Sequence, residues 1–400
     1  MKILVVHNPY QQPGGEDIVF EQECRLLRNA GHNVVTYCRS NDEIREMGPL
    51  ERLLLAPRAV WSPESRRDFS ELLEQEKPDL VHVHNTFVMI SPAIFSACYD
   101  AQIPVVHTLH NYRLMCPSAT FYRQGRVCED CTTGGLRQGI RHACFHDSHA
   151  LTAVIASMIA IHRRLGTWDH PLHSYIALSQ FARQKFVEAG LPASRLFVKP
   201  NFVDPDPGPC DAKEDYAVFV GRLSPEKRVS TLLTAWERST TRIPLFILGG
   251  GPQLEELKQV AREKNLDGVK FLGQLPRPLA VARIHKARFL IFSSEWYENF
   301  PVTIVEAFAS ATPVICSRLG AMQEIVSDGS TGLHFSPGDA KDLAGKLDWA
   351  WSNPAKMTAM GQSARQEYER LYSAERNYAQ LLDIYNQVLA TGHSHRAVTA

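Results

Sequence analysis

The segment ENFPVTIVE, from Glu298 to Glu306, carries two carboxylates with seven residues between them. Pro301 suits the first position of a helix, because its fixed φ is already helical and its missing N–H is not needed there. The apolar run TIVEAFA that follows predicts a buried helix, with Glu298 in the loop before it and Glu306 in its first or second turn. The free N–H groups of such a helix start bind anions, and carboxylates accept hydrogen bonds from sugar hydroxyls.

A simpler interpretation of the same segment stays open at this point. Glu298 would be a solvated loop residue, and Glu306 would interact with the dipole at the helix N-terminus. The rest of the chain has to decide between the two.

A pair of cations follows a second apolar run. The motif GRLSPEK (221–227) lies directly after the predicted strand YAVFV, with Ser224 suited to cap a helix. Arg222 and Lys227 would lie at the carboxyl end of that strand, where open α/β sheets bind ligands. Arginine as a fork and lysine as a point charge suit a diphosphate.

Two glycine-rich turns also follow predicted strands and open predicted helices. They are Gly14–Gly15 and the triplet 249–251, which contains Gly250. Glycines allow a ligand to approach the backbone closely, although either turn can be merely a turn. Neither has the G-x-G-x-x-G spacing, which argues against a dinucleotide site.

The composition is that of a globular protein, with 44% hydrophobic and 22% charged residues in 400. A net charge of zero gives no sign of a nucleic-acid partner. Residues 101–200 are basic, with 11 Lys or Arg against 5 Asp or Glu, which suggests an anionic ligand or surface or a solvated face. MKILVVHNPY reads as a first strand rather than a signal peptide, so we expect a cytoplasmic protein.

Short β-branched runs alternate with amphipathic helical patterns along the whole chain. In the second half the predicted strands are 216–220, 243–248, 269–273, 288–292 and 313–316. This alternation predicts an α/β protein with two parallel sheets, that is, two Rossmann-like doubly wound domains. We expect an N-terminal domain at 1–200, a proline-rich linker at 201–214, a C-terminal domain at 215–372, a helix at 373–391 and a disordered tail at 392–400. The helix at 373–391 would pack back toward the N-terminal domain.

Taken together, these motifs resemble the family 4 retaining glycosyltransferases, which have the GT-B fold with a cleft between the two domains. The resemblance rests on the N-terminal glycine loop, PVVHTLHN, GRLSPEK, LGGGP, KFLG and the long run SSEWYENFPVTIVEAFASATPVICSRLGAMQEIVSDGSTGLHF. It covers essentially the whole chain and is densest across 216–338.

The resemblance implies a role for each matching position. His110 and Glu298 would act on the donor sugar as the catalytic residues, and Arg222 and Lys227 would hold the pyrophosphate. Glu306 would accept hydrogen bonds from the ribose. The remaining donor-binding positions would be Gly14, Gly15, Gly250, Gln274, Leu275, Asn299, Phe300, Pro301 and Val302. The resemblance implies no cofactor for catalysis, and the one Asp-x-Asp spacing, Asp204 to Asp206, lies in the linker.

Three positions depart from the usual family pattern. Arg228 and Ala311 stand where glycine is common, and Pro301 also replaces a frequent glycine. None of these departures removes a charged ligand-binding residue, so they do not affect the expectation of activity. They concern the preference for one donor sugar over another.

Four cysteines form a separate group in an insertion at 112–149. Cys116, Cys128, Cys131 and Cys144 have the spacing C-x11-C-x2-C-x12-C. One C-x2-C pair with two further thiolates predicts a structural zinc site, and a redox pair or free thiols are the alternatives.

The apolar stretch Ala150–Ile161 is too short to span a bilayer, and it continues through Arg163 and Arg164 to Trp168. It is either a buried helix or one that rests at a membrane interface. The second possibility makes the protein a candidate for peripheral contact with the inner face of a membrane.

The function implied by the resemblance is transfer of a sugar from a nucleotide diphosphate sugar, UDP favoured over GDP, to a hydroxyl of a glycan or lipid-linked glycan. This chemistry belongs to polysaccharide or glycoconjugate biosynthesis. A nucleotide-sugar epimerase on the same fold and a non-catalytic zinc-stabilised scaffold are the alternatives. The retained charged set of His110, Arg222, Lys227, Glu298 and Glu306 argues against the scaffold.

Overall fold

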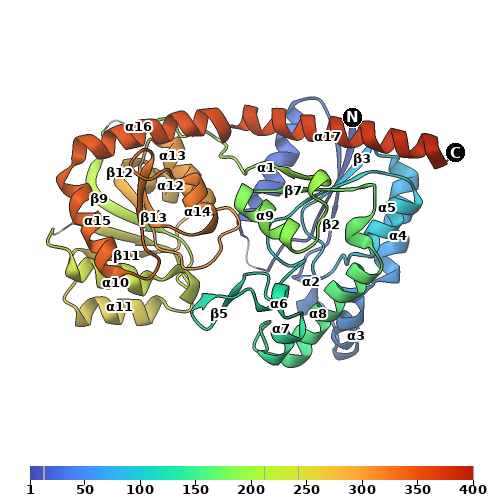
Figure 1. Cartoon of the computed structure of the whole chain (residues 1–400), viewed down its shortest axis with the longest axis horizontal. Coiled ribbons are helices and arrows are strands. Elements are labelled where there is room, and N and C mark those ends of the chain that lie inside the picture. The colour runs from blue at the N-terminus through green and yellow to red at the C-terminus, as the bar shows by residue number, and fades with distance from the viewer. Residues whose placement is uncertain (12–13, 211, 242, 400) are drawn as a thin grey trace. The chain divides into compact units, whose positions relative to one another are not determined.

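The computed structural model describes residues 1–11, 14–210, 212–241 and 243–399 of the chain (Figure 1). Its internal contacts define two compact units. Unit 1 comprises residues 1–121, 129–200 and 377 onward, and unit 2 comprises residues 122–128 and 201–376. Each unit contains its own six-stranded parallel sheet, which confirms the prediction of two Rossmann-like doubly wound domains.

The sheet of unit 1 has the order β2-β1-β3-β4-β7-β8. Its strands are β1 (Lys2–His7), β2 (Asn33–Cys38), β3 (Leu80–Val83), β4 (Val105–Thr108), β7 (His173–Ala177) and β8 (Leu196–Val198). The order reverses between β1 and β3, and such a switch point opens a crevice at the carboxyl ends of the strands. The residues that follow β1, β3 and β4 are therefore those positioned to meet a ligand.

The helices of unit 1 lie between successive strands. They are α1 (Gly15–Asn29), α2 (Glu43–Glu46), α3 (Pro49–Val60), α4 (Pro63–Glu76), α5 (Ala93–Asp100), α6 (Asp130–Thr133), α7 (Arg137–Arg141), α8 (His149–Arg164) and α9 (Gln180–Glu188), with 3-10 turns η1 (Thr167–Asp169) and η2 (Ala193–Arg195). The central strand β1 is apolar on both faces, and Ile3 to Val6 are at most 1% exposed. A strand covered on both faces reads as a continuous hydrophobic run, as KILVV does.

The sheet of unit 2 has the order β11-β10-β9-β12-β13-β14. Its strands are β9 (Glu214–Val220), β10 (Leu245–Leu248), β11 (Val269–Gly273), β12 (Ala287–Phe292), β13 (Val314–Ser317) and β14 (Gly332–Phe335). This is the strand order of a dinucleotide-type Rossmann sheet, with the switch point between β9 and β12. Strand β14 is the one member that the sequence analysis did not anticipate.

Alternate residues of β9 face two separate cores in unit 2. Ala217 and Phe219 pack into one, and Tyr216 and Val218 into the other. The helices that supply these cores are α10 (Val229–Arg238), α11 (Leu254–Glu263), α12 (Arg277–Lys286), α13 (Val302–Ala309), α14 (Gly320–Ile325), α15 (Ala340–Ser352) and α16 (Pro354–Leu371). The 3-10 turn η3 (Pro225–Lys227) precedes α10.

Two segments belong to a different unit from their neighbours in sequence. The hairpin of β5 (Tyr122–Arg123) and β6 (Arg126–Val127) belongs to unit 2, where Arg228 donates to the carbonyl of Gly125 at 2.5 Å. The long helix α17 (Ala374–Thr399) contributes its residues from Asn377 onward to unit 1. There the hydroxyl of Tyr385 lies 2.7 Å from Nδ1 of His82.

Helix α17 continues to Thr399, through the segment in which we expect a disordered tail. The segment GHSHRAVT contains one glycine and no proline, so no residue in it forces the helix to end. Within the described part of the chain, we find no helix with both the length and the apolar character needed to span a bilayer.

Candidate functional site

The switch point of unit 2 gathers the charged residues that follow β9 and β12. Lys227 donates from Nζ to Oε1 of Glu298 at 2.5 Å, and Ser294 donates to the same oxygen at 2.7 Å. Glu298 is 7% exposed, so its carboxylate is largely withdrawn from water and held by these two donors. Arg222 follows β9 directly and is exposed.

Aromatic rings surround the Lys227 ammonium group. Its Nζ lies 5.3 Å from the ring centre of Phe292 and 5.4 Å from that of Trp296. Cations are attracted to aromatic faces at these distances. Lys227 is therefore held in place by a carboxylate and two rings at the strand end.

Helix α13 starts one residue later than expected. Pro301 is its N-cap residue, with φ −81° and ψ 88°, and Val302 is the first helical residue. The ψ of Pro301 is outside the helical region, which corrects its assignment to the first turn. Glu306 lies in the second turn, as expected, and is 7% exposed. Its Oε1 accepts a hydrogen bond from Nε of Arg277 at 2.8 Å.

The glycine triplet 249–251 packs against the loop that carries Arg222. A Cβ built on Gly249 would lie 1.9 Å from the carbonyl oxygen of Gly221, and one on Gly251 would lie 2.4 Å from that of Leu223. Both glycines have positive φ, at 142° and 153°. Gly250 is different, because a Cβ there would meet only the Gln274 side chain, at 3.7 Å.

The other predicted positions in unit 2 lie close to these groups in sequence and differ in exposure. Gln274 is exposed, Pro301 is buried, and Leu275, Asn299, Phe300 and Val302 are partly buried.

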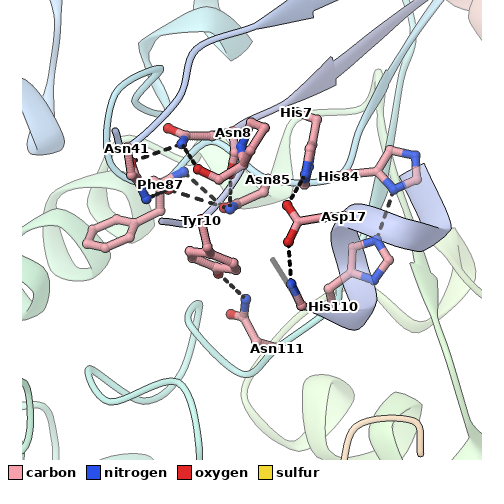
Figure 2. Close-up of polar contacts among 12 residues, drawn as sticks. His7, Asn8, Tyr10, Asp17, Asn41, His84, Asn85, Phe87, His110 and Asn111 are labelled. Atoms are coloured by element: carbon pink, nitrogen blue, oxygen red, sulfur yellow. Dashed lines mark hydrogen bonds and ion pairs between the residues drawn. The ribbon is translucent and has the colours of Figure 1, made fainter. Parts of the chain in front are cut away.

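The switch point of unit 1 brings His110 beside a second histidine. Nε2 of His110 lies 2.9 Å from Nδ1 of His84, which follows β3 directly (Figure 2). Both line one pocket of unit 1, together with residues such as Asn85, Asn111 and Arg113. Burial is the main cause that holds the pKa of His84 and of His110 well below the usual range, so both rings are neutral at pH 7.

Buried asparagines tie the neighbouring loops together. Asn8 donates to Oδ1 of Asn41 at 2.9 Å, and Asn85 donates to the carbonyl of Asn8 at 2.8 Å (Figure 2). Oδ1 of Asn8 accepts from the N–H of Met89 at 2.8 Å. These bonds join the loops after β1, β2 and β3, and so fix the frame in which His84 and His110 lie.

The N-terminal glycine loop leads into α1 beside this frame. Asp17 accepts from the N–H of Gly14 at 2.6 Å and lies 2.8 Å from Nε2 of His7 (Figure 2). A Cβ on Gly15 would meet nothing within 4 Å. The helix start is therefore held by Asp17, while the second glycine borders open space.

Glu16 follows the glycines and contacts a polar group at the pocket edge. Its carboxyl interacts with Tyr10 and Asn111, and Nδ2 of Asn111 donates to the Tyr10 hydroxyl at 3.3 Å. Burial, followed by the charge of Asp17, raises the pKa of Glu16 to about 8. The nearby Arg113 guanidinium lies 4.3 Å from the ring centre of Phe87.

The four cysteines of the predicted zinc site are divided between the two units. Across the described ranges, one group of three potential metal ligands lies within 4.8 Å, and it consists of Glu23, His82 and His84. Cys128 belongs to unit 2, whereas Cys116, Cys131 and Cys144 belong to unit 1. Zinc binding by these cysteines stays a prediction.

Several polar residues at the two sites were not singled out from sequence. They are His84, Glu23 and Lys199 in unit 1, and Arg277 and Ser294 in unit 2. For Ser294 the signal was its place in the SSEWYENF run at the end of β12. For Glu23 and Lys199, the only indication in the sequence was a charged residue at a position that faces the core.

Known proteins share this architecture of two Rossmann-like units. Anabaena Alr3699/HepE, solved in complex with UDP, aligns over 97% of this chain and all of its own with a TM-score of 0.70 and 18% identity. Sucrose-phosphate synthase from Thermosynechococcus elongatus aligns over 97% of this chain and 99% of its own, with a TM-score of 0.69 and 19% identity. The fold is GT-B.

Sequence comparison gives the family. Residues 13–207 match the profile described as "Glycosyltransferase Family 4", and residues 204–367 match "Glycosyl transferases group 1". The chain belongs to the family 4 glycosyltransferases.

Individual relatives are distant. O-antigen chain mannosyltransferase C of Escherichia coli is 27% identical over 44% of this chain and 47% of its own length. A glycogen synthase of Mycobacterium tuberculosis is 26% identical over 72% of this chain and 64% of its own length. The matched part of the chain thus spans between about half and two thirds of the length of these relatives.

Proposed function

We propose that this chain is a retaining glycosyltransferase that uses a nucleotide diphosphate sugar, UDP favoured over GDP, and glycosylates a hydroxyl of a glycan or lipid-linked glycan. The observation that carries the proposal is the meeting of Lys227, Glu298 and Ser294 at the switch point of unit 2. A cation and a buried carboxylate at a strand end match a diphosphate joined to a sugar. The complex of Alr3699/HepE with UDP supports a uridine nucleotide.

In the proposed reaction, Arg222, Lys227 and the N-terminal amides of α13 stabilise the negative charge that develops on the leaving diphosphate. Charges fixed before the reaction stabilise such a transition state without further rearrangement. Glu298 would accept hydrogen bonds from the sugar hydroxyls, and Glu306 from the ribose. His110 would bind the donor sugar, a role that the family resemblance implies.

Calorimetry with UDP, GDP and ADP tests the donor site, on the wild type and on Arg222→Ala. We expect one nucleotide to bind, with UDP first in rank, and Arg222→Ala to weaken it by tenfold or more. Arg262→Ala, which removes an exposed arginine in the last turn of α11, is the matched control. The absence of binding by all three nucleotides would contradict the proposal.

Product analysis separates transfer from epimerisation. Incubation with the donor and a panel of glycan acceptors should give a glycosylated product and free nucleotide diphosphate. An isomeric nucleotide sugar formed without acceptor would instead support the epimerase. The anomeric configuration of the product, measured by NMR, tests retention.

We also propose that unit 1 rests on an anionic membrane surface through helices α3 and α8, which pack against each other (Figure 1). Five large hydrophobic side chains are exposed on this pair and at its ends, namely Leu54, Trp61, Leu151, Ile161 and Leu165. Arg163 and Arg164 are exposed near the end of α8, and residues 148–168 contain no Asp or Glu. Apolar side chains flanked by cations favour an anionic lipid interface.

Co-sedimentation with vesicles tests this surface. Wild-type protein should bind vesicles that contain phosphatidylglycerol and not vesicles of phosphatidylcholine alone. The variant Leu151→Gln/Ile161→Gln should lose most of this binding, whereas Leu279→Gln, an exposed leucine of unit 2, should retain it. Equal binding by both variants would contradict the proposed surface.

A further inference from the structure

A buried row of polar side chains lies behind His110 in unit 1. His84 connects His110, at 2.9 Å, to the carboxylate of Glu23, whose Oε2 lies 3.5 Å from Nε2 of His84. Glu23 in turn accepts from Nζ of Lys199 at 2.6 Å. Lys199 is 0% exposed, Glu23 1% and His84 3%, so three successive members of the row are withdrawn from water.

Glu23, His82 and His84 also satisfy the spacing of a metal site. Two observations argue against a metal there. The Lys199 ammonium already provides the positive charge next to Glu23. Both ring nitrogens of His82 lie within hydrogen-bond distance of hydroxyls, at 2.8 Å from Thr108 and 2.7 Å from Tyr385. The group is therefore explained by hydrogen bonds rather than by a cation.

The donor and acceptor groups of these side chains allow one arrangement of protons in the row. A carboxylate only accepts hydrogen bonds, and a neutral imidazole has one donor and one acceptor nitrogen. Nε2 of His84 and Oε2 of Glu23 are both buried, neither makes a hydrogen bond within the described residues, and the two atoms lie 3.5 Å apart. A carboxylate attracts a proton on the facing nitrogen and repels a lone pair there, so the proton lies on Nε2 of His84 and Nδ1 is the acceptor.

The same reasoning then applies to His110. If Nδ1 of His84 accepts, Nε2 of His110 must carry the proton and donate along the 2.9 Å contact. Nδ1 of His110 is left as a lone-pair acceptor. His110 is only partly buried and lines the pocket, so it can offer that acceptor to a ligand.

We propose that Lys199, Glu23 and His84 form a positioning array that fixes the tautomer of His110, so that His110 accepts a hydrogen bond from a donor-sugar hydroxyl. The array follows from the contacts within unit 1, and its effect on the sugar rests on the proposed function. A ligand with a hydroxyl at this position satisfies Nδ1, whereas a ligand without a donor leaves it unsatisfied. Such a loss weakens recognition strongly when the group is buried on binding.

Lys199 determines which atom donates and which accepts at each contact of the array. An isolated buried carboxylate is costly and takes up a proton when its cation is removed. A protonated Glu23 can donate to Nε2 of His84, which would reverse each bond in the row. His110 would then carry its proton on Nδ1 and present a donor.

The tautomer of His110 can be measured by NMR without any substrate. In protein labelled with ¹⁵N at histidine, two-bond proton–nitrogen correlations at pH 7 distinguish the two tautomers, and His110→Asn assigns the signal. We expect protons on Nε2 of His110 and Nε2 of His84. A proton on Nδ1 of His110, or on both of its nitrogens, would overturn the proposal whether or not the chain transfers sugars.

Variants test whether the array causes this tautomer. Lys199→Met should shift the His110 nitrogen signals toward the Nδ1–H form, and His84→Phe should remove the fixed tautomer. His173→Phe, which removes another fully buried histidine of the same sheet, should leave the His110 signals unchanged. Unchanged signals in a folded Lys199→Met would overturn the role of Lys199. If that variant does not fold, the wild-type tautomer still decides the proposal.

Kinetics connect the array to the proposed reaction. His84→Gln can accept from His110 and donate to Glu23, so it should retain kcat/KM to within about fivefold. His84→Phe should lose roughly tenfold or more, mainly in kcat if the hydroxyl contact strengthens in the transition state. Equal losses of kcat/KM in His84→Gln and His84→Phe, together with the expected tautomer in the wild type, would overturn the link between the tautomer of His110 and recognition of the sugar. If no variant and no wild type shows transfer, the proposed function fails while the NMR result stands.

Discussion

Nζ of Lys227 lies 2.5 Å from Oε1 of Glu298, so the two residues assigned to different parts of the donor neutralise each other in the structure. Lys227 is assigned to the diphosphate and Glu298 to the sugar. For Lys227 to contact a phosphate fully, its bond to Glu298 has to lengthen or be shared. On the proposed function, the diphosphate–sugar junction would lie beside this pair, and binding of the two parts of the ligand would be interdependent.

Replacing Glu298 by glutamine should separate nucleotide binding from transfer. The amide keeps the hydrogen bond from Ser294 but no longer neutralises Lys227, so UDP should bind as tightly as to the wild type or a few times more tightly. Transfer should fall by roughly a hundredfold, because a charged acceptor of sugar hydroxyl bonds is lost. Calorimetry with UDP and initial rates with the UDP-sugar measure the two effects. Loss of UDP binding in this variant would contradict the assignment of Glu298 to the sugar.

The glycine triplet offers an internally controlled test of the close packing around Arg222. Gly249→Ala and Gly251→Ala each place a methyl group within 2.4 Å of a backbone carbonyl, at a positive φ, so each should destabilise unit 2 by about 2 kcal/mol or more. Gly250→Ala meets no such obstacle, and its stability should change by less than about 0.5 kcal/mol.

Gly250→Ala should nevertheless weaken UDP binding several-fold if the ligand approaches the backbone there. Thermal unfolding and calorimetry on the three variants give both quantities. Normal UDP affinity in Gly250→Ala would remove this residue from the donor site without affecting the packing argument.

The sequence was sufficient to place the charged residues of the candidate site in unit 2 on their elements, because these residues are local. Arg222 and Lys227 follow one strand, and Glu298 and Glu306 flank one helix start, so strand and helix patterns were sufficient to place them. Strand β14 was missed because GLHF is only four residues long and does not alternate clearly. Pro301 was placed one residue too far into the helix, an error typical of helix boundaries.

The array behind His110 could not be predicted for the opposite reason. Glu23, His84 and Lys199 lie on three elements separated by 61 and 115 residues in sequence. Each is a single polar residue beside apolar ones, and the order of the parallel strands decides which of them meet. The cysteine spacing poses the reverse question, because its regular pattern is divided between the two units and zinc binding stays a prediction.

Arg277 should modulate the proposed ribose contact, since its Nε donates to Oε1 of Glu306 at 2.8 Å. Arg277→Ala should weaken UDP binding by roughly threefold to tenfold, because Glu306 loses the partner that orients it. Glu306→Gln should weaken UDP more and abolish most transfer.

A modified ligand isolates the ribose contribution. Wild-type protein should bind 2′-deoxy-UDP more weakly than UDP, whereas Glu306→Gln should bind the two almost equally. A wild type that does not distinguish the two nucleotides, or full activity in Glu306→Gln, would contradict the assignment of Glu306 to the ribose.

Glu16 should make the stability of unit 1 depend on pH. Burial, followed by the charge of Asp17, raises the pKa of its carboxyl from 4.5 to about 8 on folding. Between pH 4.5 and 8 the Glu16 carboxyl is protonated in the folded chain and ionised in the unfolded chain. The contribution of Glu16 to the free energy of unfolding is therefore complete below pH 4.5 and is lost as the pH rises through 8. The glutamine side chain of Glu16→Gln cannot ionise, so this variant should not lose stability in this pH range for that reason.

We therefore expect Glu16→Gln to become more stable than the wild type by a margin that grows between pH 5 and 8, by roughly 1 to 4 kcal/mol, and then levels off. Urea unfolding of both proteins from pH 5 to 9 measures the margin. Glu21→Gln, an exposed change on the same helix, is the control and should show a margin independent of pH. A constant margin for Glu16→Gln would mean that Glu16 is ionised throughout, and that the contacts with Tyr10 and Asn111 bind a carboxylate rather than a carboxylic acid.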